Sequence, residues 1–386
     1  MIQRIGSEKL LGLSRTFKAV AVTGSRQTGK TTLVKHCFSA LPYVSLENPD
    51  TRLFATTDPR GFLAGYPNGA ILDEIQRVPE LFSYLQEILD NSTQKGKFIL
   101  TGSNNFLLQQ TISQSLAGRI GYFNLQPFSL GELQTAGICP ESDNELMLKG
   151  FYPPIYDQHI SASDWMPNYV RTYIERDVRQ LKNISDLLVF ERFIRLVAGR
   201  CGQELNLSSI SVEVGVDVKT IQSWIGILEA SYLIFLLRPH HQNFNKSIVK
   251  RPKLYFYDCG LVCWLLGIQS SNQLDLHPLR GAIFENMVVG EMLKIRSNKG
   301  EPVNLFYWRD KTGHEVDLII DSFPLLTPIE IKSGKTVQAD FFRNLKYWTS
   351  LNKSDQAILL YGGSEKQMRS NGFQVLPWRT LAEDNL

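Results

Sequence analysis

The sequence lacks the cysteine patterns that would indicate a disulfide framework or a zinc site. Its 386 residues include five cysteines, and no two of them form a CxxC pair. Cys259 and Cys263 are four positions apart in an apolar stretch, with no second pair and no histidine at ligand spacing. An odd number of scattered thiols is typical of a reducing compartment. We therefore expect free cysteines and no structural zinc.

Long apolar runs and a strong charge bias are missing as well. The N-terminus has no apolar core of about 7–15 residues such as a signal peptide carries. The longest apolar runs, such as residues 232–237, fall far short of a membrane span. The net charge of +3 permits a nucleic-acid partner without arguing for one. No internal repeat or low-complexity tract occurs. We expect a cytoplasmic globular protein with no membrane partner.

The N-terminal third alternates strand and helix patterns. Apolar strand segments are predicted over residues 18–23, 43–46, 69–74 and 97–103, and helices over 31–40 and 81–89. Such alternation predicts an α/β fold whose parallel sheet is covered on both faces. The length itself favours two or three domains. After residue 133 the pattern becomes helical, and strands are predicted again near 303–308, 315–320, 328–332, 357–361 and 373–376.

A phosphate-binding motif lies between the first predicted strand and the first of these helices. Residues 24–31, GSRQTGKT, match G-x-x-x-x-G-K-[ST] in full. Glycines let backbone N–H groups point at a phosphate, and the helix N-terminus adds a positive partial charge. Lys30 is expected to reach the β- and γ-phosphates, and the Thr31 hydroxyl to bind Mg²⁺. The other residues expected around the nucleotide are Gly24, Ser25, Arg26, Gln27, Thr28, Gly29 and Thr32. The motif predicts ATP and magnesium as cofactors.

An acidic pair ends the predicted strand over residues 69–74. Asp73 is expected to hold Mg²⁺ through water, and Glu74 to polarise the attacking water as general base. Acidic pairs at strand ends are also common surface features. The upstream phosphate motif favours the catalytic interpretation here.

Two further candidates follow the strand over residues 97–103. Ser103 at its tip could orient the attacking water or sense the γ-phosphate, or could only cap the loop. Arg119 is a candidate arginine finger, supplied in cis or by a neighbouring subunit, with a plain surface arginine as the alternative. A finger from a neighbour would require a homo-oligomer.

Several stretches together resemble one prokaryotic family. The segments GSRQTGKTT, LDEIQRVPELFSYLQEILD, ILTGSN, SLAGRI, PFSLGEL, YVRTYIERDV, KTIQSWIGILEASYLI and PKLYFYDCGL are similar to those of AAA-type P-loop ATPases with a C-terminal DUF4143 region. The resemblance covers nearly the whole chain. It implies a P-loop ATPase domain over residues 1–138, a helical and winged-helix-like domain over 139–275, and a restriction-endonuclease-like α/β domain over 276–386.

The middle region carries a helix-turn-helix pattern. Asp217 is a candidate N-cap for a helix over residues 218–230. Apolar residues at helical spacing, which should pack inward, are Ile221, Trp224, Ile225 and Leu228. DNA binding is one use of this organisation. Because Lys219 is the one cation near the helix start, packing against the ATPase domain is the alternative.

Four charged residues near the C-terminus form a nuclease-like pattern. Glu285 lies on an apolar helix face, and Asp317, Glu330 and Lys332 lie on two predicted strands. If the strands pair as a hairpin, the carboxylates Glu285, Asp317 and Glu330 could bind Mg²⁺ with Lys332 beside the attacking water. The spacing resembles the PD-(D/E)xK nuclease core, although Val316 stands where that motif often has proline.

Two functions are compatible with this sequence. In the first, a nucleotide cycle controls a nuclease-like module that acts on nucleic acid, with DNA favoured over RNA. In the second, ATP binding orders a protein-interaction surface, and the C-terminal fold is a silent scaffold. Both need Lys30 and Asp73. They differ in the roles of Asp317, Glu330 and Lys332.

Overall fold

The computed structural model describes residues 2–102, 116–173, 186–240, 250–352 and 356–383, and the chain forms two compact units. The first unit comprises Met1–Phe128 together with two short returning segments, Ala230–Tyr232 and Arg296–Glu301. The second unit comprises Ser129–Glu229, Leu233–Ile295 and Pro302–Leu386. Most of the predicted second and third domains therefore lies within one unit.

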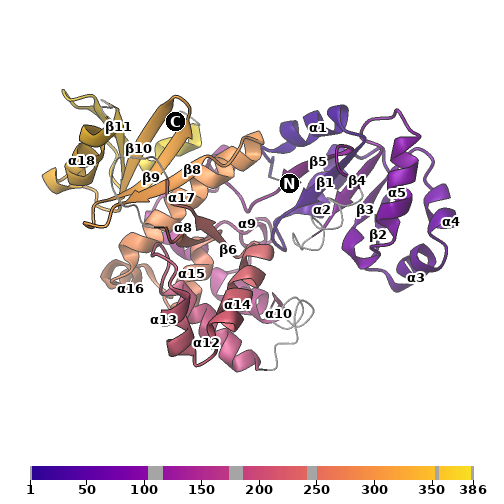
Figure 1. Ribbon diagram of the computed structural model, residues 1–386, viewed down its shortest axis with the longest axis horizontal. Coiled ribbons are helices and arrows are strands. Elements are labelled where there is room, and N and C mark those ends of the chain that lie inside the picture. The colour runs from indigo at the N-terminus through magenta and orange to yellow at the C-terminus, as the bar shows by residue number, and fades with distance from the viewer. Residues whose placement is uncertain (1, 103–115, 174–185, 241–249, 353–355, 384–386) are drawn as a thin grey trace. The chain divides into compact units, whose positions relative to one another are not determined.

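The first unit is built on a five-stranded parallel sheet with strand order β2-β3-β4-β1-β5 (Figure 1). This confirms the predicted parallel sheet. Its strands are β1 (Ala19–Thr23), β2 (Tyr43–Ser45), β3 (Ala70–Asp73), β4 (Phe98–Thr101) and β5 (Ile120–Asn124). Its helices are α1 (Ser7–Thr16), α2 (Lys30–Cys37), α3 (Pro49–Thr57), α4 (Pro59–Ala64), the short 3-10 turn η1 (Ile75–Arg77) and α5 (Leu81–Asp90).

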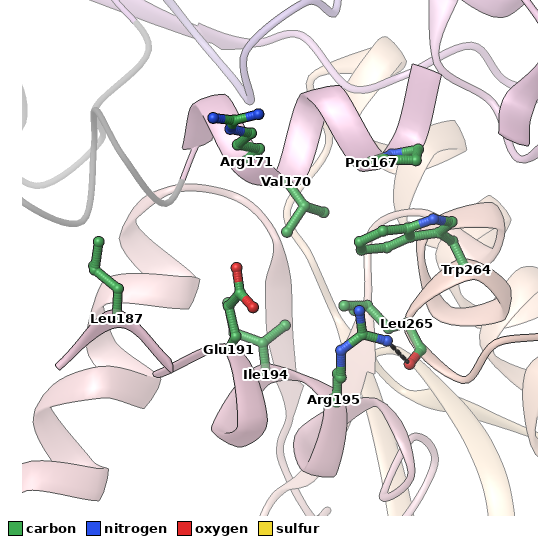
Figure 2. A pocket seen from close by; sticks show the side chains of 9 residues that line it. All are labelled: Pro167, Val170, Arg171, Leu187, Glu191, Ile194, Arg195, Trp264 and Leu265. Atoms are coloured by element: carbon green, nitrogen blue, oxygen red, sulfur yellow. Dashed lines mark hydrogen bonds between the residues drawn. The ribbon is translucent and has the colours of Figure 1, made fainter. Parts of the chain in front are cut away.

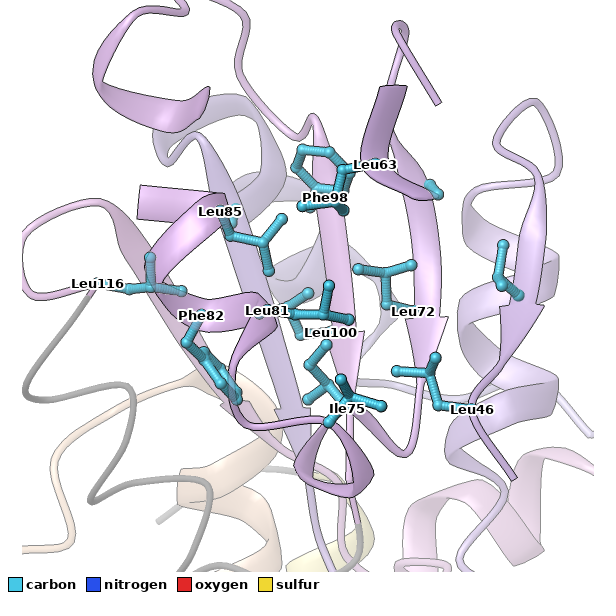
Figure 3. Packing of buried hydrophobic residues seen from close by; sticks show 14 of the residues in the cluster. Leu46, Leu63, Leu72, Ile75, Leu81, Phe82, Leu85, Phe98, Leu100 and Leu116 are labelled. Carbon is cyan, nitrogen blue, oxygen red and sulfur yellow. The ribbon is translucent and has the colours of Figure 1, made fainter. Parts of the chain in front are cut away.

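Both faces of this sheet are buried, as alternate residues of β1 demonstrate. Ala19 and Ala21 belong to one core cluster, and Val20 and Val22 to another. Helices α1 and α2 cover the second face through Leu10, Leu33 and Val34. Helices α3, α4 and α5 cover the first, where Leu81, Phe82 and Leu85 pack on Leu72 and Leu100 (Figure 3). Burial on both faces explains why these strands are almost wholly apolar.

The two returning segments complete the first unit. The Tyr232 hydroxyl donates to Thr23 Oγ1 at 2.9 Å, directly before the phosphate loop. The Ser297 hydroxyl donates to the carbonyl oxygen of Asn124 at the end of β5, also at 2.9 Å. Residues more than 100 positions downstream in the sequence therefore contact the edge of the first unit.

The second unit begins with helices. They are α7 (Leu130–Thr135), α8 (Asp143–Lys149), α9 (Pro153–Asp157), α10 (Ala162–Tyr173), α12 (Leu187–Ala198), α13 (Leu207–Val214), α14 (Val218–Ala230), α15 (Cys259–Leu265), α16 (Ser271–Leu276) and α17 (Arg280–Lys299). Strands β6 (Ile234–Leu237) and β7 (Lys253–Phe256) form an antiparallel two-stranded sheet.

The helix-turn-helix pattern is confirmed. Asp217 accepts a hydrogen bond from the Thr220 N–H at 2.9 Å and starts α14 at the predicted residue. The predicted apolar stripe on α14 is buried. Gly215, with φ of 82°, makes the turn after α13 in a backbone region that favours glycine.

A six-stranded mixed sheet closes the second unit, in the order β12-β13-β11-β10-β9-β8. Its strands are β8 (Leu305–Arg309), β9 (Glu315–Ser322), β10 (Leu325–Lys332), β11 (Ala357–Tyr361), β12 (Gln367–Met368) and β13 (Phe373–Pro377). Helix α18 (Arg343–Asn352) packs on it through Leu345 and Trp348, and the turns η3 (Ala339–Phe342) and η4 (Trp378–Glu383) flank it. The five strands expected in this region are all present.

Within the described residues, no helix has the length and apolar character needed to cross a membrane.

Candidate functional site

The loop between β1 and α2 has the backbone shape that phosphate binding requires. Gly24 has φ of 140°, and a Cβ there would lie 2.1 Å from the carbonyl oxygen of Leu125, so no other residue fits. Gly29 has φ of 89° and Gln27 has φ of 61°. Left-handed backbone within a short loop turns successive N–H groups to one side, which produces an anion-binding concavity.

Two side chains of this loop have groups that a phosphate would satisfy. The Lys30 ammonium is buried and donates to the carbonyl oxygens of Gly24 at 3.0 Å and Ser25 at 2.7 Å. The Ser25 hydroxyl is buried and has no hydrogen-bond partner among the described residues. A buried polar atom without a partner is costly in free energy. Of the other predicted loop residues, Thr28 is buried, Arg26 is half-buried, and Gln27 and Thr32 are exposed.

Asp73 ends β3 beside this loop and accepts hydrogen bonds from three hydroxyl groups. Tyr43 OH donates to Oδ2 at 2.6 Å, Thr31 Oγ1 lies 3.3 and 3.4 Å from the two oxygens, and Thr101 Oγ1 contacts Oδ1. Burial and the neighbouring Asp73 raise the pKa of Tyr43, so its phenol stays protonated and donates. The structure thus brings together Thr31 and Asp73, the two residues predicted to hold magnesium at the nucleotide.

Glu74 follows Asp73 in an unusual backbone conformation. Its φ of 56° places it in the left-handed region just before the 3-10 turn η1. The Gln76 amide nitrogen contacts Glu74 Oε2. The predicted general base therefore lies next to the magnesium ligand in sequence and is held by a residue of the following turn.

Arg4 was not anticipated from the sequence. Its buried guanidinium donates to the carbonyl oxygen of Thr28 at 2.7 Å and to that of Gln126 at 2.6 Å, and it lies over the Phe128 ring. In a planar trans peptide the carbonyl and the next N–H point in opposite directions. By fixing the Thr28 carbonyl, Arg4 turns the Gly29 N–H to the opposite side of that peptide. Its partners are 24 and 122 residues away, so no local sequence motif predicts these contacts.

Arg119 stands apart from this arrangement. Arg119 directly precedes β5, where Ile120 pairs with Ala19 at the start of β1, while the phosphate loop follows the other end of β1. Its guanidinium binds Asp90, with Nη2 3.0 Å from Oδ2. A cis role is therefore incompatible with this placement, and a role supplied by a neighbouring subunit stays a prediction. Ser103 lies outside the described residues.

The second predicted site lies on β9 and β10, which pair as an antiparallel hairpin as expected. Ile329 opposes Leu318, so Glu330 and Asp317 follow as cross-strand neighbours. The Lys332 ammonium is 2.7 Å from Glu330 Oε1 and 3.6 Å from Asp317 Oδ2. Asp317 Oδ2 also accepts from the Ile331 N–H at 2.8 Å. The structure brings these three predicted residues together.

Glu330 is unusual in this hairpin because its carboxylate is buried. Glu330 is 3% exposed, and its Oε2 has no hydrogen-bond partner among the described residues. Burial and the adjacent Asp317 raise the pKa of Glu330 to about 8. Two buried carboxylates repel each other, and a divalent cation that both of them bind would relieve this repulsion. Asp317 and Glu330 therefore fit a metal ion as a pair.

Glu285, the third predicted ligand, is occupied by other partners. Its Oε1 accepts from Tyr255 OH at 2.6 Å and from the Lys253 ammonium at 3.1 Å. Burial, and then the charge of Asp317, raise the pKa of Glu285, while Lys253 opposes that rise. Over the described residues, no three His, Cys, Asp or Glu side chains are grouped closely enough to hold a metal ion. Lys253 was not anticipated as a partner of Glu285, because it is the polar first residue of an otherwise apolar strand.

A separate cavity of about 190 Å³ opens among helices of the second unit (Figure 2). Its lining includes Arg195, which donates to the Leu265 carbonyl oxygen at 3.1 Å and lies over the Trp264 ring. None of the predicted site residues lines it.

Three family models match consecutive segments of the chain. An AAA domain model matches residues 16–134, the domain of unknown function DUF8612 matches 141–272, and the domain of unknown function DUF4143 matches 280–381. Among curated proteins, the chain is 29% identical over 323 residues to uncharacterized protein Rv2008c of Mycobacterium tuberculosis and to uncharacterized protein Mb2031c of Mycobacterium bovis. These alignments cover 82% of this chain and 70% of each relative.

Solved structures show partial similarity at low sequence identity. The Walker-type ATPase PABY2304 of Pyrococcus abyssi has 15% identity and a TM-score of 0.46, over 69% of this chain and 96% of that one. AMPPCP-bound DnaA from Aquifex aeolicus has 14% identity and a TM-score of 0.31, over 58% of this chain and 86% of that one. At such low TM-scores these likenesses add nothing to what the loop geometry supports.

Proposed function

We propose that this chain, which combines an AAA domain with a C-terminal DUF4143 region, is a magnesium-dependent ATPase. The observation that carries the proposal is the meeting of Lys30, Thr31 and Asp73 at the glycine loop, with Thr31 Oγ1 within 3.4 Å of both Asp73 oxygens. A lysine, a hydroxyl and a carboxylate in this order are what a nucleoside triphosphate with magnesium needs.

Each residue has a distinct role in this proposal. Lys30 exchanges its two carbonyl partners for the β- and γ-phosphate oxygens, and the loop N–H groups and Ser25 Oγ contact the same phosphates. Thr31 and Asp73 hold the magnesium ion, which neutralises charge on the phosphate oxygens when bound. Glu74 leaves Gln76 and orients the attacking water as general base.

The test separates binding from chemistry. Lys30→Ala should weaken ATP binding, and Glu74→Gln should retain binding but lose turnover, by about 100-fold each. Calorimetry reports ATP affinity and phosphate release reports turnover. Lys95→Ala, which removes an exposed lysine of the same unit, is the matched control and should behave as wild type. Wild-type affinity and turnover in both site variants would refute the assignment.

A second function is favoured by the hairpin that carries Asp317, Glu330 and Lys332. The unpartnered Glu330 Oε2 and the adjacent Asp317 support a nuclease-like module of the PD-(D/E)xK type, controlled by the nucleotide cycle and acting on nucleic acid, DNA before RNA. Asp317 and Glu330 would hold a divalent cation, which supplies Lewis acidity toward a phosphodiester. Lys332 would lie beside the attacking water.

The alternative is a nucleotide switch whose C-terminal fold is a scaffold for protein interaction. Incubation of the full chain with plasmid, single-stranded DNA and RNA, with Mg²⁺ or Mn²⁺ and with or without ATP, distinguishes the two. Cleavage that Asp317→Asn abolishes supports the nuclease-like module. Absence of cleavage under every condition, with ATP turnover retained, supports the switch.

A further inference from the structure

Arg4 lies in the short segment before α1, and its guanidinium joins the phosphate loop to the chain that follows β5. The side chain is buried, and Nη1 donates to the carbonyl oxygen of Thr28 at 2.7 Å. Nη2 donates to the carbonyl oxygen of Gln126 at 2.6 Å and lies 3.5 Å from that of Pro127. The Phe128 ring centre is 4.9 Å from the guanidinium carbon. One side chain from outside the motif therefore contacts both segments.

The segment over residues 125–128 lies against the phosphate loop near the start of the loop and near its end. At the start, a Cβ on Gly24 would lie 2.1 Å from the Leu125 carbonyl oxygen, so the two backbones are in close contact. Near the end, the contact runs from Thr28 through Arg4 to the same segment. This segment is also where the first unit ends in the sequence.

The peptide between Thr28 and Gly29 is the part of the loop that Arg4 fixes. The Thr28 hydroxyl donates to the carbonyl oxygen of Ser25 at 3.0 Å, and the Gly29 carbonyl oxygen accepts from the Leu33 N–H of α2 at 2.9 Å. The side chain before this peptide and the carbonyl after it are thus held by the loop and the helix. The orientation of the peptide plane itself is set by the bond that its carbonyl oxygen accepts from Arg4.

This peptide needs a restraint because glycine follows it. Glycine accepts φ values on either side of zero, so the peptide plane before Gly29 can rotate with little steric hindrance. After such a rotation, the Thr28 carbonyl oxygen would point toward a bound phosphate and repel it. When Arg4 holds that oxygen, the Gly29 N–H points the opposite way and is available to a phosphate oxygen.

We infer that Arg4 is a positioning residue of the phosphate loop, which fixes the Thr28–Gly29 peptide in the orientation that binds phosphate and ties it to residues 126–128. The inference rests on the proposed nucleotide site and adds to it a residue outside the motif. Arg4 acts without touching the phosphate, because its donors lie on the carbonyl side of the peptide. Any ligand that places a phosphate in the loop should therefore lose affinity without Arg4, whatever base it carries.

The test measures binding of Mg·ADP and of inorganic pyrophosphate to the full chain by calorimetry. Arg4→Met should weaken both ligands by at least about tenfold, the loss expected for one hydrogen bond to a charged acceptor. Pyrophosphate has neither base nor ribose, so similar losses for the two ligands assign the effect to the loop. Arg15→Met, which removes an exposed arginine of α1, is the matched control and should bind both ligands as wild type does.

Kinetics separate positioning from a catalytic contact. The Gly29 N–H would bind phosphate equally in the ground state and the transition state. Arg4→Met should therefore raise KM for ATP by the same factor as the Kd for ADP, and change kcat by less than about twofold. A large fall in kcat at unchanged KM would mean that Arg4 acts on the transferred phosphoryl group, which overturns the inference. So would ADP and pyrophosphate affinities within about twofold of wild type.

A second variant covers the case in which Arg4→Met does not fold. Arg4→Lys retains the positive charge, but an ammonium lacks the planar fork with which a guanidinium reaches two carbonyl oxygens. It should weaken the binding of ADP and of pyrophosphate by about threefold each. Wild-type affinity for both ligands in Arg4→Lys would overturn the inference, because the phosphate loop would then not depend on its tie to residues 126–128.

The outcomes also separate this inference from the proposed ATPase. A chain that binds ADP and pyrophosphate through Arg4, but releases no phosphate from ATP, supports the positioning role and contradicts the ATPase. A chain whose ATP turnover is lost in Lys30→Ala and Glu74→Gln, but whose ligand affinities are unchanged in Arg4→Met, is an ATPase in which the positioning role is wrong.

Discussion

The phosphate loop and the C-terminal carboxylate cluster both contain a buried lysine, but the two lysines contact different kinds of oxygen. Lys30 donates to two neutral backbone carbonyls, whereas Lys253 contacts two carboxylates. A carbonyl partner can be exchanged for a phosphate with a net gain, because the charged acceptor binds more strongly. If the lysine leaves a carboxylate partner, that carboxylate stays buried without a compensating charge, which is strongly destabilising. The first lysine is positioned for a ligand, and the second completes the fold.

The largest expected effect follows from this contrast and concerns stability. Lys253→Met should lower the free energy of unfolding by about 3–5 kcal/mol, because it leaves Glu285 without its cation and Glu315 with Arg309 alone. Lys30→Met should cost less, about 1–2 kcal/mol, because it loses two hydrogen bonds to neutral carbonyl groups and leaves no carboxylate unpaired. Urea unfolding without metal or nucleotide gives both values. Equal losses of unfolding free energy in the two variants would contradict the proposed difference between the two lysines.

A smaller effect is expected at Tyr43, which donates to Asp73 Oδ2 at 2.6 Å. Tyr43→Phe should lower kcat/KM for Mg·ATP by about tenfold, since Asp73 loses one of its three hydroxyl donors and its orientation. Turnover measured against Mg²⁺ concentration shows whether the substitution weakens the affinity for Mg²⁺. Tyr84→Phe, which removes the hydroxyl of a ring that lies under the Arg60 guanidinium, is the control. Unchanged kinetics in Tyr43→Phe would show that Thr31 and Thr101 suffice.

A buried carboxylate outside both sites tests how burial alone affects a pKa and the stability of the fold. Glu291 on α17 is fully buried, accepts from the Leu130 N–H at 2.7 Å and lies 3.4 Å from the Lys294 ammonium. Burial raises the pKa of Glu291 above its ordinary value of 4.5. The folded chain therefore keeps a proton that the unfolded chain releases, so stability falls as pH rises above about 4.5 and levels off above the folded pKa.

Replacing that carboxyl tests the sign. Glu291→Gln should flatten the fall in stability, whose slope is at most about 1.4 kcal/mol per pH unit. The amide oxygen can still accept from Leu130, so the fold is expected to persist. Urea unfolding at several pH values provides the measurement. A stability that rises with pH in this window, and that the substitution abolishes, would mean that Lys294 outweighs burial.

The smallest effect is expected at Arg119. Because it lies at the end of β1 opposite the phosphate loop, Arg119→Ala should leave ATP affinity within about twofold. If a neighbouring copy uses this arginine, wild-type turnover per chain rises with protein concentration and the variant's does not. Turnover over a dilution series distinguishes these cases. A large loss of ATP affinity in the variant would contradict the placement.

The sequence was informative where the chemistry is local and uninformative where it is distant. The phosphate loop, Asp73 and the hairpin of Asp317 and Glu330 each lie within short motifs whose periodicity and end residues predict their elements. Strand β5, Ile-Gly-Tyr-Phe-Asn, escaped prediction because its glycine and exposed tyrosine interrupt the apolar pattern. Arg4 and Lys253 escaped because their partners come from other elements, up to 122 residues away.

The returning segments have a consequence for the order in which the protein can be made. The first unit includes residues 230–232 and 296–301, with Tyr232 hydrogen-bonded to Thr23 and Ser297 hydrogen-bonded to Asn124. During synthesis, a nascent chain that ends at residue 138 has the whole parallel sheet but none of these contacts. Closing them requires loops of more than 100 residues, which are slow to form. Completion of the first unit therefore waits until the chain has been translated to about residue 301.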